Sequence, residues 1–244
     1  MKDANCHIVI ELLRLSTKNT SFAAEESELA DQPMSHSAIA AALDNIGATL
    51  LQAQSHSGRG LRARYNDGTN NAIMISGCQH GNETPKQLAH YVLLICCQYE
   101  KNAHFGISPL ENPDGNALFL RLILENLHHM HHATRYTAFG NDLQNAPDSS
   151  PLERERQIEG WKYSGAKLHV NLHDYLSYGW IRPLLGYIPH NFAMWTLPKG
   201  FFLVFRYRDG WEKTTLQFVE KVTACFALNK AGLAMNGLQV KLYR

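Results

Sequence analysis

The sequence of 244 residues has few cysteines, no long hydrophobic run and almost no net charge. Its five cysteines are odd in number and irregularly spaced, which argues against a disulfide framework and favours a reducing compartment. The longest uninterrupted apolar run covers residues 91–97, which is too short to cross a bilayer. With 23 basic and 22 acidic side chains, the chain lacks the basic excess of a dedicated nucleic-acid binder. We therefore expect a cytoplasmic protein with neither a membrane nor a nucleic-acid partner.

The chain also lacks the short motifs of several large enzyme classes. It contains no glycine-rich phosphate loop, no G-x-S-x-G nucleophile motif and no dinucleotide-binding fingerprint. Histidine, in contrast, is abundant, with 13 residues. Because imidazole is the commonest metal ligand in proteins, this surplus favours metal chemistry.

Apolar residues alternate along the chain between helical and strand spacing. Helical spacing begins at Ser35 and recurs over 84–99, over 117–132 and from 214 onwards. Strand patterns cover residues 49–54, 61–65, 72–75, 105–107, 167–172 and 201–205. Turns are expected at 57–60 and, of the hairpin type, at 66–68. This alternation, without an internal repeat, predicts an α/β fold with three α/β/α layers and a mixed, largely parallel central sheet.

A first candidate metal-binding pair follows the strand expected at 72–75. His80 and Glu83 are three residues apart, so the chain can direct an imidazole and a carboxylate towards one ion, a mixture of donors that suits zinc. Gly77 and Gly81 relieve backbone crowding around such ligands. Taken alone, this spacing is more often a solvated helix face.

Two further histidines lie in and just after the strand expected at 167–172. His169 and His173 are four residues apart, so on a strand both face the same side. Open α/β sheets place their ligands at the carboxyl ends of strands, which makes His173 the better metal ligand. The alternative for either residue is a hydrogen-bonded histidine in the core.

Four motifs in this order resemble those of the zinc carboxypeptidase family of metallopeptidases, including its bacterial and deacylase-like branches. They are His80-Gly81-Asn82-Glu83, Asn112-Pro113-Asp114-Gly115, Arg135 followed by Gly140 and Asp142-Leu143, and His173-Asp174-Tyr175. The resemblance covers about residues 70–190, and an ordered set is far more specific than any single motif.

The resemblance implies a zinc-dependent hydrolase of a peptide or related amide bond, with a peptide or acyl-amino acid as substrate. One Zn²⁺ ion would be held by His80, Glu83 and His173. Three protein ligands leave zinc an open position for water, the arrangement of catalytic rather than structural sites. The Asn-Pro-Asp-Gly segment would be mainly a structural turn.

Other residues take roles from the same resemblance. Arg135 would polarise the scissile carbonyl and stabilise its developing oxyanion. Asp142 would orient His80 from outside the ligand set, and Tyr187 is our choice for a tyrosine beside the substrate. The histidines at 128, 129, 131 and 132 are expected on a solvated or rim-lining face rather than at a specific metal site.

The sequence departs from the family in two places. Gln144 and Asn145 stand where the family has an Asn-Arg pair that grips a terminal carboxylate, so strict carboxypeptidase specificity is not expected. The family's general base is a glutamate on a late strand. After His173 the only glutamates are Glu212 and Glu220, both in an expected helix, so the general base is unassigned.

We expect a single domain over residues 1–244 that lacks its carboxy-terminal strand. The Val-Ile-Glu-Leu segment at residues 9–12 resembles that missing strand, but a helix start is the preferred interpretation there. The alternative function is a catalytically impaired metal- or ligand-binding protein on the same fold. The sequence predicts no oligomeric state.

Overall fold

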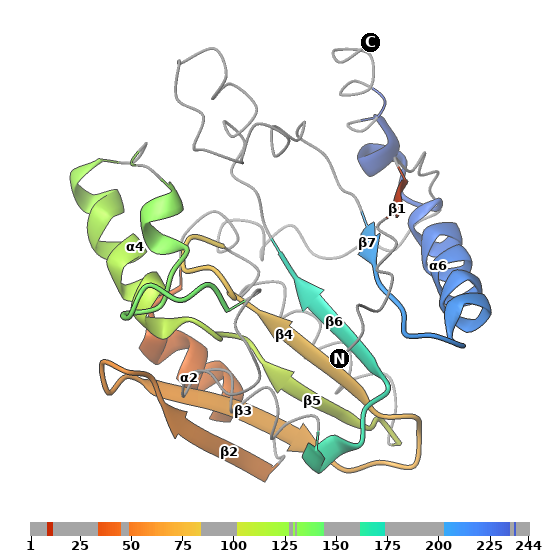
Figure 1. Cartoon of the computed structure of the whole chain (residues 1–244), viewed down its shortest axis with the longest axis horizontal. Coiled ribbons are helices and arrows are strands. Elements are labelled where there is room, and N and C mark those ends of the chain that lie inside the picture. Colours follow the sequence, from red (N-terminus) through yellow and green to blue (C-terminus); the bar gives the residue numbers. More distant parts are fainter. Residues whose placement is uncertain are drawn as a thin grey trace. The chain divides into compact units, whose positions relative to one another are not determined.

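The computed structural model describes residues 9–11, 34–44, 49–83, 102–126, 129, 131–143, 162–173, 203–234 and 237 (Figure 1). The chain divides into two compact units, which are described separately. The sheet unit comprises residues 24–174, and the terminal unit comprises residues 1–23 together with 175–244. That these units form a single domain stays a prediction.

The sheet unit is built on five strands in the order β2-β3-β5-β4-β6 (Figure 1). The strands are β2 (Thr49–Gln54), β3 (Gly60–Asn66), β4 (Ile73–Gly77), β5 (Phe105–Ser108) and β6 (Leu168–Leu172). Strand β4 runs parallel to both β5 and β6, whereas β3 is antiparallel to both β2 and β5. The predicted α/β class and mixed sheet are confirmed, with the parallel pairings grouped around β4.

The two predicted turns have different outcomes. Between β2 and β3 the N–H of Ser55 donates to the carbonyl of Arg59 at 2.8 Å, and Gly58 takes a φ of +74°, so this hairpin is confirmed. Residues 66–68 do not form a hairpin, because β3 pairs with β5 rather than with β4. Gly68 instead allows a close approach, since an added Cβ would lie 2.3 Å from the carbonyl oxygen of Ala103.

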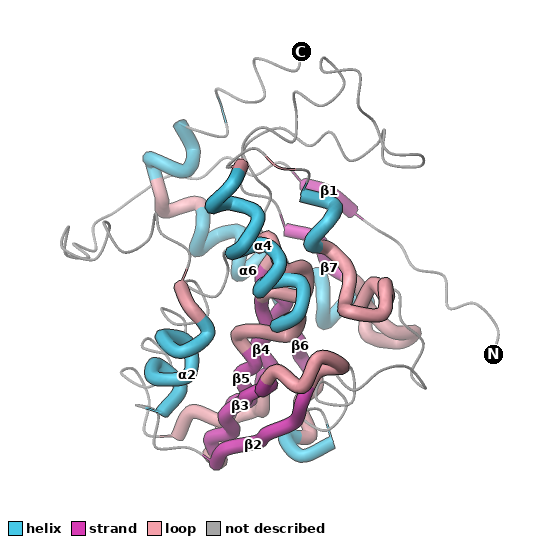
Figure 2. The backbone as a smooth tube through the Cα atoms, turned by 90° about the vertical axis from the view of Figure 1, so that its left-hand side faces the viewer, coloured by secondary structure: helices cyan, strands magenta, loops and turns pink. Residues whose placement is uncertain are grey.

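Helix α2 (His36–Asp44) covers one face of this sheet (Figure 2). It begins where the Oγ of Ser35 accepts a hydrogen bond from the N–H of Ala38 at 3.2 Å, a typical N-cap. Ile39 and Leu43 are one helical turn apart and buried, as the predicted spacing requires. They form a core cluster with residues of β4 and β5, among them Ile75, Phe105 and Ile107.

Helix α4 (Pro113–Glu125) begins earlier and ends earlier than the helix predicted over 117–132. The side-chain oxygen of Asn112 accepts a hydrogen bond from the N–H of Gly115 at 2.8 Å, which caps the helix. Pro113 follows at the first helical position, where its missing N–H costs nothing. The Asn-Pro-Asp-Gly segment is therefore the start of a helix, and residues 131–134 form a separate 3₁₀ helix.

The terminal unit contains a second sheet, in which β1 (Val9–Glu11) pairs antiparallel with β7 (Leu203–Phe205). The strand expected at 201–205 is confirmed for its described part, and α6 (Glu212–Phe226) confirms the helix expected from 214. The helix start preferred for residues 9–12 was wrong. Val9 and Ile10 are β-branched and fit a strand once β7 supplies a partner.

Some predictions fall outside the described residues, namely the helix at 84–99, Gln144, Asn145 and Tyr187. Among the helices that are described, none has the length and apolar character needed to span a membrane.

Candidate metal centre

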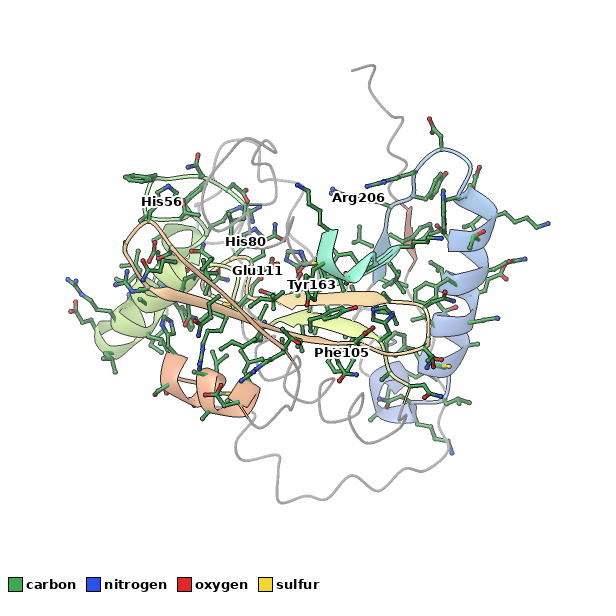
Figure 3. The ribbon with its side chains drawn as sticks, turned by 90° about the horizontal axis from the view of Figure 1, so that it is seen from below. His56, His80, Phe105, Glu111, Tyr163 and Arg206 are labelled. Carbon is green, nitrogen blue, oxygen red and sulfur yellow. The ribbon has the colours of Figure 1, made fainter. Side chains whose placement is uncertain are left out.

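The candidate centre lies beyond the carboxyl ends of two neighbouring parallel strands. In the register of β4 with β6, Gly77 is opposite Leu172, so the segments that follow both strands begin at the same edge of the sheet. His173 directly follows β6, and His80 lies in the loop after β4 (Figure 3). Between the end of β4 and His80 the chain turns sharply at Cys78, which is fully buried with a φ of +53°. A non-glycine residue in this conformation is uncommon and is typical of functional loops.

The loop that carries His80 and Glu83 is packed against the first turn of α4. The N–H of Gly81 donates to the carbonyl of Thr134 at 2.9 Å, and the side-chain amide of Asn116 donates to the carbonyl of Gly81 at 2.8 Å. A Cβ at position 81 would lie 2.0 Å from the carbonyl carbon of Gly115. Only glycine fits there, which explains why the His-Gly-Asn-Glu segment approaches the helix so closely.

Three side chains converge at this edge. Glu83 Oε1 lies 2.6 Å from His80 Nδ1 and 2.7 Å from His173 Nδ1. The potential ligand atoms of all three residues lie within 4.8 Å of one another, so the group could hold a metal ion. His80 and Glu83 are buried, whereas the side chain of His173 is 34% exposed and opens the group towards solvent.

The ionisation of Glu83 and the two histidines beside it favour binding of a cation. Burial alone would raise the pKa of Glu83, but hydrogen bonds from His173 and His80 outweigh it and lower the pKa to about 2. For His80, burial lowers the pKa, while Asp142 and Glu83 together raise it above its usual value. An ionised, buried carboxylate thus faces two imidazole nitrogens at hydrogen-bonding distance. A metal ion can take the place of the shared protons, and two nitrogens with one carboxylate oxygen form a zinc-like donor set.

Asp142 links this group to Arg135. One carboxylate oxygen of Asp142 lies 3.5 Å from His80 Nε2, and the other accepts a hydrogen bond from Arg135 Nε at 2.9 Å. The backbone carbonyl of Arg135 in turn accepts a hydrogen bond from the Asn112 side chain at 3.2 Å, which ties it to the cap of α4. The structure therefore places Asp142 beside His80, and Arg135 beside Asp142.

His169 belongs to a different environment. Its Nε2 lies 2.7 Å from the hydroxyl of Ser76, which is fully buried. Burial, followed by the charge of His173, lowers the pKa of His169 to about 4. A hydrogen-bonded histidine, the alternative considered for this residue, is what the geometry supports.

Two amide side chains beside the group were not predicted from the sequence. The side-chain N–H of Asn171, on β6, donates to Oε1 of Gln79, the residue that precedes His80. Asn171 lies two residues before His173 on the same face of the strand, and this spacing is the only signal that points to it. The bond connects the two histidine-bearing segments directly.

One member of the histidine cluster at 128–132 differs from the expected solvated or rim-lining face. His129 is 7% exposed and packs 5.5 Å from the ring of Phe119, which lies on α4. Its Nδ1 lies 3.2 Å from the carbonyl of Asn126. The histidine packs against the end of the helix because the helix ends before residue 126.

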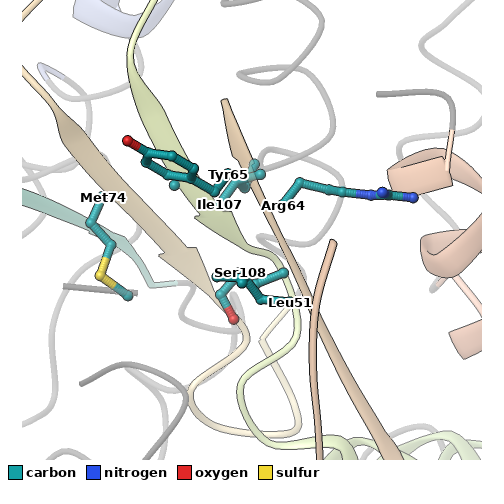
Figure 4. A pocket seen from close by; sticks show the side chains of 8 residues that line it. Leu51, Arg64, Tyr65, Met74, Ile107 and Ser108 are labelled. Atoms are coloured by element: carbon teal, nitrogen blue, oxygen red, sulfur yellow. The ribbon is translucent and has the colours of Figure 1, made fainter. Parts of the chain in front are cut away.

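A separate hollow lies on the sheet (Figure 4). It is lined by Leu51, Ala63, Arg64, Tyr65, Met74, Gly106, Ile107 and Ser108. None of these residues belongs to the metal-binding group, so the hollow is not part of the candidate centre.

Solved structures that resemble this chain include metallocarboxypeptidases and a succinylglutamate desuccinylase/aspartoacylase. One is a metallocarboxypeptidase from Pseudomonas aeruginosa, with 18% identity over 59% of this chain and 40% of its own length and a TM-score of 0.44. Another is carboxypeptidase A from Helicoverpa armigera, with 17% identity over 61% of this chain and 47% of its own and a TM-score of 0.40. A succinylglutamate desuccinylase/aspartoacylase from Rhodobacter sphaeroides matches at 15% identity over 53% of this chain and 40% of its own, with a TM-score of 0.33.

These matches include the family predicted from the four motifs. The chain spans less than half the length of each of these three proteins. No protein-family model and no curated protein sequence matches the chain. At such low identity the likeness assigns no reaction to this chain.

Proposed function

We propose that the protein is a zinc-dependent hydrolase that cleaves a peptide or related amide bond in a peptide or acyl-amino acid. The observation that carries this proposal is the convergence of His80, Glu83 and His173 at one edge of the sheet. Two of these residues are buried and the third is partly open to solvent, which is the exposure that a site acting on an external substrate needs.

The three side chains would hold the ion through both Nδ1 atoms and the Glu83 carboxylate, leaving one position for water. An ion bound there would supply an acidic water molecule and would polarise a substrate carbonyl. Asp142 faces the other ring nitrogen of His80 at 3.5 Å. With an ion bound, Asp142 would orient this imidazole so that Nδ1 faces the metal.

Arg135 is the residue that we assign to the substrate carbonyl. Its Nε is bound to Asp142, and its side chain is only 12% exposed, so its position next to the candidate ligands is restrained. A guanidinium held in this way can donate to the carbonyl oxygen as negative charge develops on it. Removing one such donor typically costs about 3–4 kcal/mol of transition-state stabilisation. Tyr187 is retained as a substrate contact on the strength of the motif resemblance.

A second candidate function is a metal- or ligand-binding protein without catalytic activity. It is favoured by the positions of the late glutamates, because Glu212 and Glu220 both lie on α6. The described strand of that region, β7, has the sequence Leu-Val-Phe and carries no acid. A glutamate base on a late strand is therefore not found among the residues that the structure describes.

The decisive experiment compares wild-type protein with His173→Ala after removal of metals and titration with zinc. We expect the variant to lose one tightly bound zinc equivalent, together with hydrolysis of a panel of dipeptides and N-acyl-amino acids. His56→Ala, which alters a histidine in the β2–β3 turn, is the matched control and should keep both. Full zinc content in His173→Ala would contradict the assignment of the ligands.

Arg135→Lys separates the two candidate functions. For a hydrolase, we expect zinc content to be unchanged and kcat to fall about 100-fold or more, because lysine cannot reproduce the guanidinium geometry. If the wild-type protein binds zinc through His173 but cleaves nothing in the panel, the non-catalytic function is correct.

A further inference from the structure

A second group of polar side chains lies at the opposite end of the sheet from the candidate centre. Tyr65 is near the end of β3, Asp67 follows that strand, and His104 directly precedes β5. Because β3 and β5 are antiparallel, with Tyr65 opposite Gly106, the end of one meets the start of the other. The three side chains are thus brought to one place by strand pairing.

The potential ligand atoms of these residues are close together. His104 Nε2 lies 2.6 Å from the Tyr65 hydroxyl and 4.0 Å from Asp67 Oδ1, and the hydroxyl lies 3.4 Å from the same Asp67 oxygen. A point equidistant from the three atoms is about 2 Å from each, which is the usual distance from zinc to nitrogen and oxygen ligands. The triangle is therefore of the right size for a small metal ion.

Among these three side chains, one hydroxyl proton faces two acceptors. His104 Nδ1 lies 3.1 Å from the carbonyl oxygen of Asn70, which can only accept, so Nδ1 carries the proton of the neutral ring. Nε2 then presents a lone pair to Tyr65. The single proton of the Tyr65 hydroxyl faces two acceptors, His104 Nε2 and the carboxylate of Asp67. A backbone carbonyl that orients a histidine in this way is the usual support of a metal-binding imidazole.

No side-chain cation compensates these acceptors in the part of the chain that the structure describes. There, Asp67 forms no ion pair with a lysine or arginine, and its contacts are the ring of His104 and the hydroxyl of Tyr65. Among the described residues, the Asp67 carboxylate therefore lies beside the Tyr65 hydroxyl and the His104 ring without a lysine or arginine partner.

The Tyr65 ring is buried, whereas the Asp67 side of the group is open to solvent. The ring of Tyr65 is buried in the sheet and lies edge-on to Tyr163, with ring centroids 4.6 Å apart. Figure 4 shows its hydroxyl pointing away from Leu51 and Ser108, which also line the hollow. The side chain of His104 is 17% exposed and that of Asp67 is 87% exposed, so an ion can enter from the side of Asp67.

We propose that Tyr65, Asp67 and His104 form a second metal site, independent of the first, that binds a divalent transition-metal ion such as Cu²⁺ or Zn²⁺. The donors are the His104 Nε2 lone pair, the Tyr65 oxygen and one Asp67 oxygen, a mixed nitrogen and oxygen set that suits these ions. On binding, the Tyr65 O–H bond breaks, its proton passes to solvent and the phenolate oxygen takes the ion. The site connects the chain after β3 to the start of β5.

The test is a copper titration of the full-length chain after removal of metals. A copper-bound phenolate gives a charge-transfer band in visible light, which imidazole and carboxylate ligands do not. We expect wild-type protein to develop this band as copper is added and to saturate it with one equivalent bound at this site. We expect Tyr65→Phe to lose the band and to bind copper at this site at least 10-fold more weakly. Asp67→Asn, at an exposed position, should weaken binding without removing the band.

Two controls keep the result specific. Tyr163→Phe removes the neighbouring hydroxyl and should leave the band unchanged, because Tyr163 only packs against Tyr65. His173→Ala should also keep the band, which separates this site from the first one. Thermal unfolding in the presence of chelator checks that Tyr65→Phe remains folded. Absence of the band from wild-type protein, or an equal band in Tyr65→Phe, would overturn the proposal.

Discussion

Gly81→Ala is the substitution whose effect can be worked out most fully from the structure. The added Cβ would lie 2.0 Å from the carbonyl carbon of Gly115, 2.3 Å from the backbone nitrogen of Asn116 and 2.4 Å from the Gly115 oxygen. These are backbone atoms in the first turn of α4, which the Asn112 cap holds in place. No side chain can rotate away, so the loop and the helix must separate by about 1 Å or more.

The cost follows from what that separation breaks. Overpacking against a fixed backbone costs about 2 kcal/mol. The loop is also held by the hydrogen bonds of Gly81 to Thr134 and Asn116, each worth about 1 kcal/mol. We therefore expect Gly81→Ala to lower the free energy of unfolding by about 3–4 kcal/mol. Because the loop also carries His80 and Glu83, zinc affinity should fall about 10- to 100-fold.

Urea unfolding monitored by circular dichroism, with chelator present, measures the first effect, and competition with a zinc chelator measures the second. The matched control is Gly60→Ala, because a Cβ at position 60 would meet nothing within 4 Å and its φ is not positive. That control should change the free energy of unfolding by less than about 0.5 kcal/mol. If Gly81→Ala unfolds at the same urea concentration as Gly60→Ala and binds zinc equally well, the proposed contact between loop and helix does not exist.

Two further predictions concern pH. Burial would raise the pKa of Asp114, but hydrogen bonds from Ser55, Arg59 and the Ser57 backbone lower it below the usual 3.8. The ionised Asp114 therefore stabilises the fold above pH 3.8, and this stabilisation is lost as the pH falls through the lower pKa of the folded state. Urea unfolding between about pH 5 and pH 3 should therefore show a shallower loss of stability for Asp114→Asn than for wild type, and parallel curves would contradict this. The pKa of His169 is lowered from 6.5 to about 4, so this residue should remain neutral in the folded protein at pH 5. As the pH falls below 6.5, the unfolded state binds a proton at this residue before the folded state does, and the free energy of unfolding declines. Ring ¹⁵N chemical shifts measure this titration, and a titration midpoint above pH 6 would contradict the burial of the His169 ring.

Much of the local structure could be predicted from the sequence because it depends on short-range geometry. Strand β2 spans residues 49–54 as predicted, since its limits are set by alternation and by the Ser55–Arg59 turn. The start of α4 could have been predicted too, because Asn112 and Pro113 form a typical helix beginning. The prediction missed it by treating the motif as a turn.

Local sequence spacing predicted only part of the candidate centre. His80 and Glu83 are three residues apart, so their proximity follows from the local chain. That His173 completes the group depends on β6 lying parallel to β4, which no local pattern determines. The motif resemblance supplied that step, whereas the Gln79–Asn171 bond, which has no motif, was missed.

The sequence by itself determined where most of the described strands and helices lie and which side chains can ligate a metal, because hydrophobic period, caps and ligand chemistry are properties of neighbouring residues. Only the tertiary structure decided which strands pair. It placed β5 between β3 and β4, paired Val9–Glu11 with Leu203–Phe205, and brought Tyr65 to His104. Such pairings join residues far apart in the chain, and they are selected by the burial of whole strand faces and by backbone hydrogen bonding across the sheet, to which every strand contributes.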